Sequence, residues 1–306
     1  MPQARRIALL APPPDLSSDE AFLRQVIDGL RDLGHAVERI ALTAGVGWDA
    51  GDRLAVIDGA VLPALAGAMP RHAVVLVHHW TEDLVGCEGR LPPRVIATSA
   101  ALAQRLATAW RIAVEGIEIV PPATDDAPRS AGSGGPGCAI LSVGALIART
   151  GHEVLLRALA RLPDLDWSLT LCGSAEDDPV HAQSLAALAQ ETGIAGRVSV
   201  TSEPAWHEAD LFALASEWED YGTATAAALK RGLPVAVTSG GANAEQVPVE
   251  AGVVCPPGDI EGFSKALRRV IFDEALRRAM AEAAWQAGQG LPDWRKQARP
   301  GLCPGC

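Results

Sequence analysis

Residues 139–171 read AILSVGALIARTGHEVLLRALARLPDLDWSLTL, and this stretch contains the unit from which the fold is built. A buried strand is predicted over 139–143, where five apolar or small residues stand together. Apolar residues at helical spacing predict a helix over 151–162, and a second apolar strand follows over 167–171. A strand, a helix and a strand in this order form a βαβ unit, whose two strands run parallel in one sheet.

The same alternation of strand and helix signals continues on both sides of this unit. Residues 123–137 interrupt it with prolines, glycines and small polar residues, a composition that predicts a linker. The sequence therefore predicts an α/β fold of two doubly wound, Rossmann-like domains, 1–122 and 138–290, facing each other across a cleft, with a tail over 291–306. The other expected strands are 6–11, 37–42, 54–57, 73–77, 94–97, 117–120, 197–201, 211–215, 235–237 and 253–254, and the other expected helices contain 22–33, 100–110, 180–192, 223–231, 260–271 and 273–286.

Composition excludes several classes of protein. Of the 306 residues, 48% are hydrophobic and 21% are charged, so the chain has enough apolar surface to bury a core and is not intrinsically disordered. The formal net charge of −11 argues against a nucleic-acid partner and against a basic membrane-binding face. The longest nearly apolar stretch, 54–69, contains Asp58 and Pro63 and is too short to span a bilayer.

Cysteine and lysine usage adds two expectations. Four of the six cysteines stand alone in the sequence, which favours a reduced, cytoplasmic protein. The pair Cys303 and Cys306 has the spacing of a metal half-site, but the sequence has no second pair, so we interpret it as part of a tail and expect no metal site. Only three residues are lysine, which limits any chemistry that needs an amine, and these are Lys230, Lys265 and Lys296.

Three well-known catalytic motifs are absent from the sequence. These are the Gly-x-Gly-x-x-Gly turn of dinucleotide-binding domains, the Walker phosphate loop and the Gly-x-Ser-x-Gly nucleophile elbow. An ordinary dehydrogenase, a P-loop enzyme and a hydrolase are therefore disfavoured. Because ligands of open α/β sheets bind at the carboxyl ends of the strands, the loops that follow the strands hold the candidate residues.

Two of these loops carry basic groups. His78 and His79 follow an apolar strand and would donate to a substrate hydroxyl or act as a base, or else form a packed histidine pair. Gly144, Arg149 and Gly151 lead from a strand into a helix, where backbone N–H groups and an arginine would bind a phosphate. The alternative for this second loop is an ordinary turn with a solvated arginine.

Two further loops carry carboxylates and glycines. Residues 216–223 contain Glu217, Glu219 and Asp220 just before Gly222 and Thr223, and such carboxylates face either a polar ligand or solvent. Residues 239–245 contain Gly240 and Gly241, which allow a ligand to approach the backbone closely or simply form a turn, and end at Glu245.

The order of these motifs resembles a known family. Residues 138–290 are similar to the C-terminal domain of the retaining glycosyltransferases of group 1, also called family 4, which have the two-domain GT-B fold. The matching motifs, in order, are Val143-Gly144, Gly151, Leu171-Cys-Gly173-Ser174, Gly193-Ile-Ala-Gly-Arg197-Val198, Ala209-Asp-Leu-Phe212, Glu219-Asp-Tyr-Gly222, Gly232-Leu-Pro-Val235, Gly240–Glu245 and Pro256-Pro-Gly-Asp259. The first half is similar to the family's acceptor domain at 95–99 and 119–122, and is shorter than that domain usually is.

The resemblance implies a function and a role for each matching residue. It implies transfer of a sugar from a nucleotide-diphosphate donor to a small-molecule acceptor, with retention of configuration and without a metal ion or other cofactor. Glu219 would hold the donor sugar and His78 would contact the sugar, with His79 on the acceptor side. The remaining positions would bind the donor: Gly144, Arg149, Gly151, Gly222, Thr223, Gly240, Gly241 and Glu245.

Three positions depart from the family pattern. The family's arginine and lysine, which neutralise the donor diphosphate, fall on Ala145 and Thr150, and its second glutamate falls on Ala227. The retained Glu219 and the glycines favour a soluble glycosyltransferase in which Arg149 replaces the missing cations. The departures favour the alternative, a non-catalytic relative that binds a nucleotide, a sugar or a partner protein. Either protein is compatible with a homo-oligomer.

Overall fold

The computed structural model describes residues 4–14, 20–42, 51–65, 69 and 72–292. The chain divides into two compact units, with the division between Ala123 and Thr124. The second unit runs to Leu291. Most of the predicted tail, including Cys303 and Cys306, lies outside the described residues.

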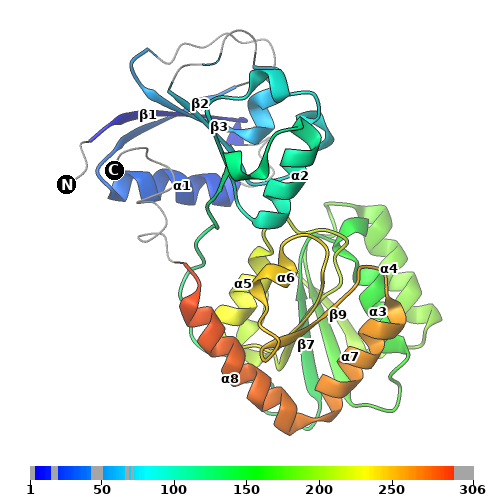
Figure 1. The fold of residues 1–306 in the computed structure, drawn as a ribbon. Helices are drawn as coiled ribbons and strands as arrows, with labels where there is room; N and C mark the ends of the chain where they lie inside the picture. The colour runs from blue at the N-terminus through cyan, green and yellow to red at the C-terminus, as the bar shows by residue number, and fades with distance from the viewer. Residues whose placement is uncertain (1–3, 15–19, 43–50, 66–68, 70–71, 293–306) are drawn as a thin grey trace. The chain divides into compact units, whose positions relative to one another are not determined.

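The first unit contains a six-stranded parallel sheet in the order β2-β1-β3-β4-β5-β6 (Figure 1). Successive residues of β1 point to opposite faces, so Ile7 and Leu9 pack with helix α1, whereas Ala8 and Leu10 pack in the cluster that contains helix α2. The strands are β1 (Arg6–Ala11), β2 (Ala36–Ala41), β3 (Leu54–Asp58), β4 (Ala73–Val77), β5 (Arg94–Ala97) and β6 (Ile117–Ile119), and the helices are α1 (Glu20–Asp32) and α2 (Ala100–Trp110).

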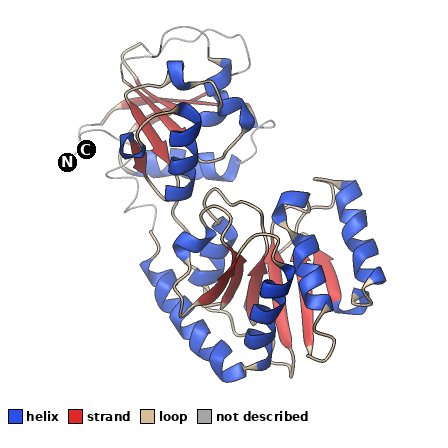
Figure 2. Cartoon of the chain, turned by 45° about the vertical axis from the view of Figure 1, so that its right-hand side comes forward, coloured by secondary structure: helices blue, strands red, loops and turns tan. Residues whose placement is uncertain are grey.

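The second unit contains another six-stranded parallel sheet, in the order β12-β11-β10-β7-β8-β9. Helices cover both of its faces, with α5 and α8 packed together on one face and α3, α4 and α7 on the other (Figures 1 and 2). The strands are β7 (Cys138–Val143), β8 (Trp167–Cys172), β9 (Val198–Thr201), β10 (Leu211–Leu214), β11 (Val235–Thr238) and β12 (Gly252–Cys255). The helices are α3 (His152–Ala160), α4 (Pro179–Glu191), α5 (Thr223–Lys230), α6 (Asn243–Gln246), α7 (Ile260–Phe272) and α8 (Glu274–Gly290).

Both sheets are doubly wound, as the sequence predicts. In the second sheet the chain runs outward from β7 to β8 and β9, and then returns to β10 on the other side of β7. The strand order therefore reverses between β7 and β10, and open α/β sheets bind their ligands at the carboxyl ends of such neighbouring strands.

The structure differs from the sequence expectations in its short helices. Residues 239–245 are not a simple glycine turn, because Asn243–Gln246 form the helical turn α6. Single 3₁₀ turns also follow β3 and β4, at Gly59–Ala64, Glu82–Leu84 and Glu88–Arg90. Segments this short have no clear hydrophobic period in the sequence. Among the described helices, none combines the length and the hydropathy that a membrane crossing requires.

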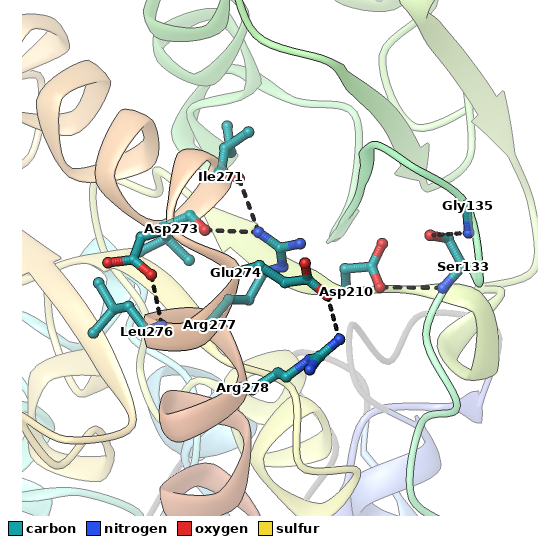
Figure 3. Close-up of polar contacts among 10 residues, drawn as sticks. Ser133, Gly135, Asp210, Ile271, Asp273, Glu274, Leu276, Arg277 and Arg278 are labelled. Carbon is teal, nitrogen blue, oxygen red and sulfur yellow. Dashed lines mark hydrogen bonds and ion pairs between the residues drawn. The ribbon is translucent and has the colours of Figure 1, made fainter.

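The stretch predicted as a linker contains no helix or strand, but it is held against the second unit by hydrogen bonds. Asp210, just before β10, accepts from the backbone N–H of Ser133 at 3.1 Å (Figure 3) and from that of Ala139, in β7, at 2.8 Å. The ammonium of Lys230, which is 3% exposed, lies 2.7 Å from Asp126. This segment is therefore an ordered part of the second unit. Figure 3 also shows the start of α8 beside it, where Asp273 caps the backbone N–H of Leu276.

Candidate functional site

Three loops meet at the carboxyl edge of the second sheet. They follow β7, β10 and β11, which are neighbours in that sheet, and they are residues 144–151, 215–222 and 239–242. The backbone N–H of Glu217 donates to the carbonyl of Arg149 at 2.8 Å, and that of Glu219 donates to the carbonyl of Gly240 at 3.1 Å. The carbonyl of Glu219 accepts in turn from Ala242 at 2.7 Å. These bonds join the three predicted loops into one layer.

Glycines make this contact between loops possible. A Cβ at Gly151 would lie 1.9 Å from the carbonyl oxygen of Ala215, and one at Gly240 would lie 2.0 Å from that of Glu217. Gly241, with φ +69°, would bring a Cβ to 2.1 Å from the carbonyl oxygen of Glu219. The family resemblance implies that these glycines bind the donor. In the structure, each of them also allows two backbone segments to come into contact.

Substitution of Gly240 should therefore destabilise the fold. We expect Gly240→Ala to lower the free energy of unfolding by about 2 kcal/mol or more, because the new methyl overlaps a backbone carbonyl that cannot rotate away. The matched control is Gly196→Ala, since a Cβ at Gly196 has no atom within 4 Å and should change stability by less than about 0.5 kcal/mol. Urea unfolding of both variants measures the difference, and equal stabilities would contradict this account of the loops.

Two helices of more than one turn begin at this edge without a capping side chain, and the single turn α6 begins there in the same way. The N-cap residues of α3 and α5 are Gly151 and Gly222, both left-handed, with φ of 71° and 83°. By contrast, α4, α7 and α8 of the same unit are capped by the aspartates Asp178, Asp259 and Asp273. A helix N-terminus carries unpaired N–H groups and the positive end of the helix dipole. The edge therefore presents two sets of backbone donors that suit an anion.

A buried polar group supports the start of α5. Asn243, which is 0% exposed, accepts a hydrogen bond from the Thr225 hydroxyl at 2.8 Å and donates to the Ser216 hydroxyl at 3.3 Å. A Cβ at Gly222 would lie 2.5 Å from the Asn243 side-chain oxygen, so Gly222 is also required here. Ser216, Thr225 and Asn243 were not predicted as site residues. The only feature of the sequence that points to them is their position near the glycines expected to bind the donor.

The predicted group of three carboxylates divides by exposure. Glu217 is exposed and Glu219 is half-buried, whereas Asp220 is 8% exposed and accepts a hydrogen bond from the Trp218 indole at 2.7 Å. The backbone of Glu219 is fixed on both sides by the loop after β11.

The residues at the positions that depart from the family pattern differ in how deeply they are buried. Thr150 is 7% exposed, and a Cβ at Gly144 would lie 2.7 Å from its methyl carbon, so this side chain is packed into the loop. Ala145 and Ala227 are half-buried. Arg149 is exposed, and its guanidinium makes no ion pair with a described residue. The two described lysines are bound elsewhere, Lys230 to Asp126 and Lys265 to Glu261.

The other two predicted donor residues lie at the surface of this edge. Thr223, the first residue of α5, and Glu245, in α6, are both exposed. Within the described part of the chain, no three side chains of the His, Cys, Asp and Glu types gather as a metal ion would need.

His152, the first residue of α3, is fully buried, and no motif singles it out. Neither ring nitrogen has a hydrogen-bond partner among the described residues. Burial, and to a smaller extent the nearby His181, lower the pKa of His152 from 6.5 to about 4. The imidazole is therefore neutral in the folded protein near pH 7.

This histidine should make the fold sensitive to acid. Between pH 6.5 and pH 4 the unfolded chain binds a proton at His152 that the folded chain does not bind, so stability falls as the pH drops through this window. The loss reaches about 3 kcal/mol near pH 4. We expect urea midpoints at pH 7.5 and 5 to differ less in His152→Leu than in the wild type. An equal difference in both proteins would contradict this assignment.

The two predicted histidines of the first unit lie after β4. His78 is nearly buried, with 6% of its side chain exposed, and its Nε2 lies 3.3 Å from Oδ1 of Asp58 at the end of β3. The Phe22 ring of α1 packs on it, with ring centroids 4.5 Å apart. His79 is half-buried. The histidines thus lie at the carboxyl edge of the first sheet, and Asp58 is a neighbour that sequence reasoning did not assign to the site.

Comparison with known proteins agrees with this arrangement. The family model for glycosyl transferases group 1 matches residues 125–287, slightly more than half of the chain. The chain is 31% identical over 150 residues to the lipopolysaccharide core biosynthesis glycosyltransferase LpsE of Rhizobium meliloti, across 47% of this chain and 42% of that protein. It is 30% identical over 177 residues to the D-inositol 3-phosphate glycosyltransferase of Corynebacterium urealyticum, across 54% and 42%. The aligned region spans about two-fifths of the length of these relatives.

Solved structures share the fold over nearly the whole chain. Sucrose-phosphate synthase from Thermosynechococcus elongatus has a TM-score of 0.80 at 18% identity and covers 96% of both chains. HepE of Anabaena, solved in complex with UDP-glucose, has a TM-score of 0.76 at 17% identity and covers 96% of this chain and 98% of its own. At these identities the likeness establishes the fold alone, which is the GT-B fold of two Rossmann-like units. The described motifs, the family match and this fold agree: the chain belongs to the group 1 glycosyl transferases.

Proposed function

We propose that this protein transfers a sugar from a nucleotide-diphosphate sugar to a small-molecule acceptor, with retention of configuration as in family 4. The observation that carries the proposal is the pair of glycine-capped N-termini, those of α3 and α5, beside Glu219 at the switch point of the second sheet. Backbone N–H donors at a helix N-terminus suit a diphosphate, and a carboxylate beside them suits the hydroxyl groups of a sugar.

Two parts of the donor, the diphosphate and the sugar, have candidate binding groups in the second unit. The diphosphate would accept hydrogen bonds from the first N–H groups of α3 and α5, with Arg149 and the exposed Thr223 at the same edge. Glu219 would accept hydrogen bonds from the sugar hydroxyls, next to the backbone of Gly240 and Gly241. When the sugar leaves, negative charge grows on the diphosphate, and donors that are already in place stabilise it.

The first unit would supply the acceptor side. His78 and His79 lie at the carboxyl edge of its sheet, and an imidazole there would contact a sugar or an acceptor hydroxyl. Because the proposed charge stabilisation uses backbone N–H groups and Arg149, the proposed reaction needs no metal ion. Cys138 and Cys172 are buried free thiols, which fits action in the reducing cytoplasm where nucleotide sugars are available.

A turnover assay tests this proposal. The protein is incubated with the UDP, GDP and ADP conjugates of glucose and with a set of small acceptors, and the released nucleoside diphosphate is measured. We expect release with one of the three bases and a product with the anomeric configuration of the donor, read by proton NMR. An inverted product would contradict retention, and the absence of release with all three bases would contradict the transferase proposal.

A second candidate function is binding without catalysis. It is favoured by the setting of Thr150, whose packed side chain stands where the family has a lysine, and by Lys230 and Lys265, which are bound elsewhere. A non-catalytic relative would bind a nucleotide, a sugar or a partner protein at the same edge. Thermal unfolding with the same nucleotides, measured beside the turnover assay, separates the two functions. A non-catalytic relative that binds a nucleotide would be stabilised by it and would release no diphosphate.

A further inference from the structure

Asp58 is a buried carboxylate whose place in the fold calls for an explanation. It is the last residue of β3, and 2% of its side chain is exposed. An isolated carboxylate at such a depth is costly, so a buried aspartate needs hydrogen bonds and a partner that can carry positive charge. One of its bonds comes from the backbone N–H of Ala60, which donates to Oδ1 at 3.0 Å and starts the 3₁₀ turn after β3.

The second partner of Asp58 is His78. The two strands β3 and β4 are parallel neighbours, with Asp58 in register with Leu76, two residues before the histidine. The strands therefore bring the carboxylate and the imidazole to the same edge, where Oδ1 and Nε2 lie 3.3 Å apart. A carboxylate at this distance favours a proton on the nitrogen nearer to it, which is Nε2.

Packing fixes the two groups relative to each other. The Phe22 ring covers one face of the imidazole, with 33° between the ring planes, while Asp58 contacts its edge. The turn after Asp58 is pressed against β4, because a Cβ at Gly59 would lie only 3.1 Å from the Val77 side chain. The carboxylate therefore cannot move away from the histidine without a shift of the strand end.

We infer that Asp58 is the positioning residue of His78, holding its ring and keeping its proton on Nε2. The inference rests on the proposed function, in which His78 contacts the sugar or the acceptor. A histidine whose ring and tautomer are set in advance loses no free energy to reorientation when the reaction begins. Asp58 would act only through the His78 ring.

A double-mutant cycle on turnover tests this pairing. Asp58→Asn keeps an oxygen for the Ala60 N–H but removes the charge, and we expect it to lower kcat about 10- to 100-fold while KM for the donor changes less than about 2-fold. If the pair acts as a unit, Asp58→Asn should lower kcat much less in a His78→Ala background. If the fold-loss in kcat of the double variant equals the product of the two single fold-losses, the inference is overturned. The control Asp273→Asn changes another helix-capping aspartate, at the start of α8, and should leave kcat unchanged.

A second measurement does not need activity. Long-range proton–nitrogen NMR spectra of the ligand-free protein report which ring nitrogen of His78 carries the proton. We expect protonated Nε2 in the wild type and a changed pair of nitrogen shifts in Asp58→Ala, with the rest of the amide spectrum retained. A proton on Nδ1 in the wild type, or identical shifts in the variant, would overturn the inference. If the wild type releases no nucleotide, the proposed transfer fails, and these spectra still decide whether Asp58 positions His78.

Discussion

Glu219→Gln should lower kcat for sugar transfer about 100-fold and leave the affinity for the nucleoside diphosphate nearly unchanged. The backbone of Glu219 is held by Gly240 and Ala242, so the substitution removes a charge without moving the loop. Hydrogen bonds to a charged group contribute about 1.5–3 kcal/mol each, and two sugar hydroxyls bound by one carboxylate account for an effect of this size. Calorimetry with the nucleoside diphosphate and a turnover assay with its sugar conjugate measure the two quantities.

The matched control for this prediction is Glu217→Gln. Glu217 is two residues earlier in the same loop, and its backbone is also bonded to a neighbouring loop, but its side chain is exposed. Because the Glu217 side chain is exposed, the variant should keep kcat within about 2-fold of the wild type. Equal losses in both variants would show that the loop matters only through its total charge, and that Glu219 has no particular role.

Arg149→Ala should lower the transfer rate about 100- to 1,000-fold, which is the usual cost of removing one donor from a site that stabilises developing negative charge. The effect is expected to be this large because Ala145 and Thr150 stand where the family has its two cations, and Thr150 is packed into its own loop. Arg149 precedes the N-terminus of α3 by two residues and is exposed there. We also expect weaker binding of the nucleoside diphosphate, measured by calorimetry.

Arg161→Ala is the control for the loss of a positive charge. Arg161 is an exposed arginine at the opposite end of α3, so its removal changes the net charge equally. Its variant should bind and react like the wild type. If Arg149→Ala also keeps its nucleotide affinity and its rate, Arg149 does not replace the family's missing cations, and the stabilisation must come from the helix N-termini alone.

The regular elements could be predicted from the sequence because each carries a local signal. The helix predicted over 100–110 matches α2 (Ala100–Trp110), since its apolar period and its Ser99 cap are both local features. The strands of the second sheet could be predicted because β10 and β11 are short apolar runs in which every residue is buried. Two doubly wound domains could be predicted from the two successive runs of strand–helix units.

The contacts within the candidate site could not be predicted, because they join residues that are distant in the sequence. Gly240 could be selected as a glycine in a loop, but its contact with the Glu217 carbonyl depends on β11 lying beside β10. Asp58 lies in no motif, and Asn243 lies in the Gly240–Glu245 motif but was given no role there. Each becomes important only when the fold brings Thr225 or His78 against it.

In the proposed function, a nucleoside diphosphate binds at the N-termini of α3 and α5. The most direct measurement is a titration of the nitrogen-15-labelled protein with UDP, GDP and ADP, following the backbone amide signals. We predict that one of these ligands shifts the amides of residues 151–154 and 222–225 together, because the diphosphate accepts hydrogen bonds from both helix starts. Titrations in which none of the three ligands moves these amides, or in which the shifts lie in another part of the chain, would contradict the account.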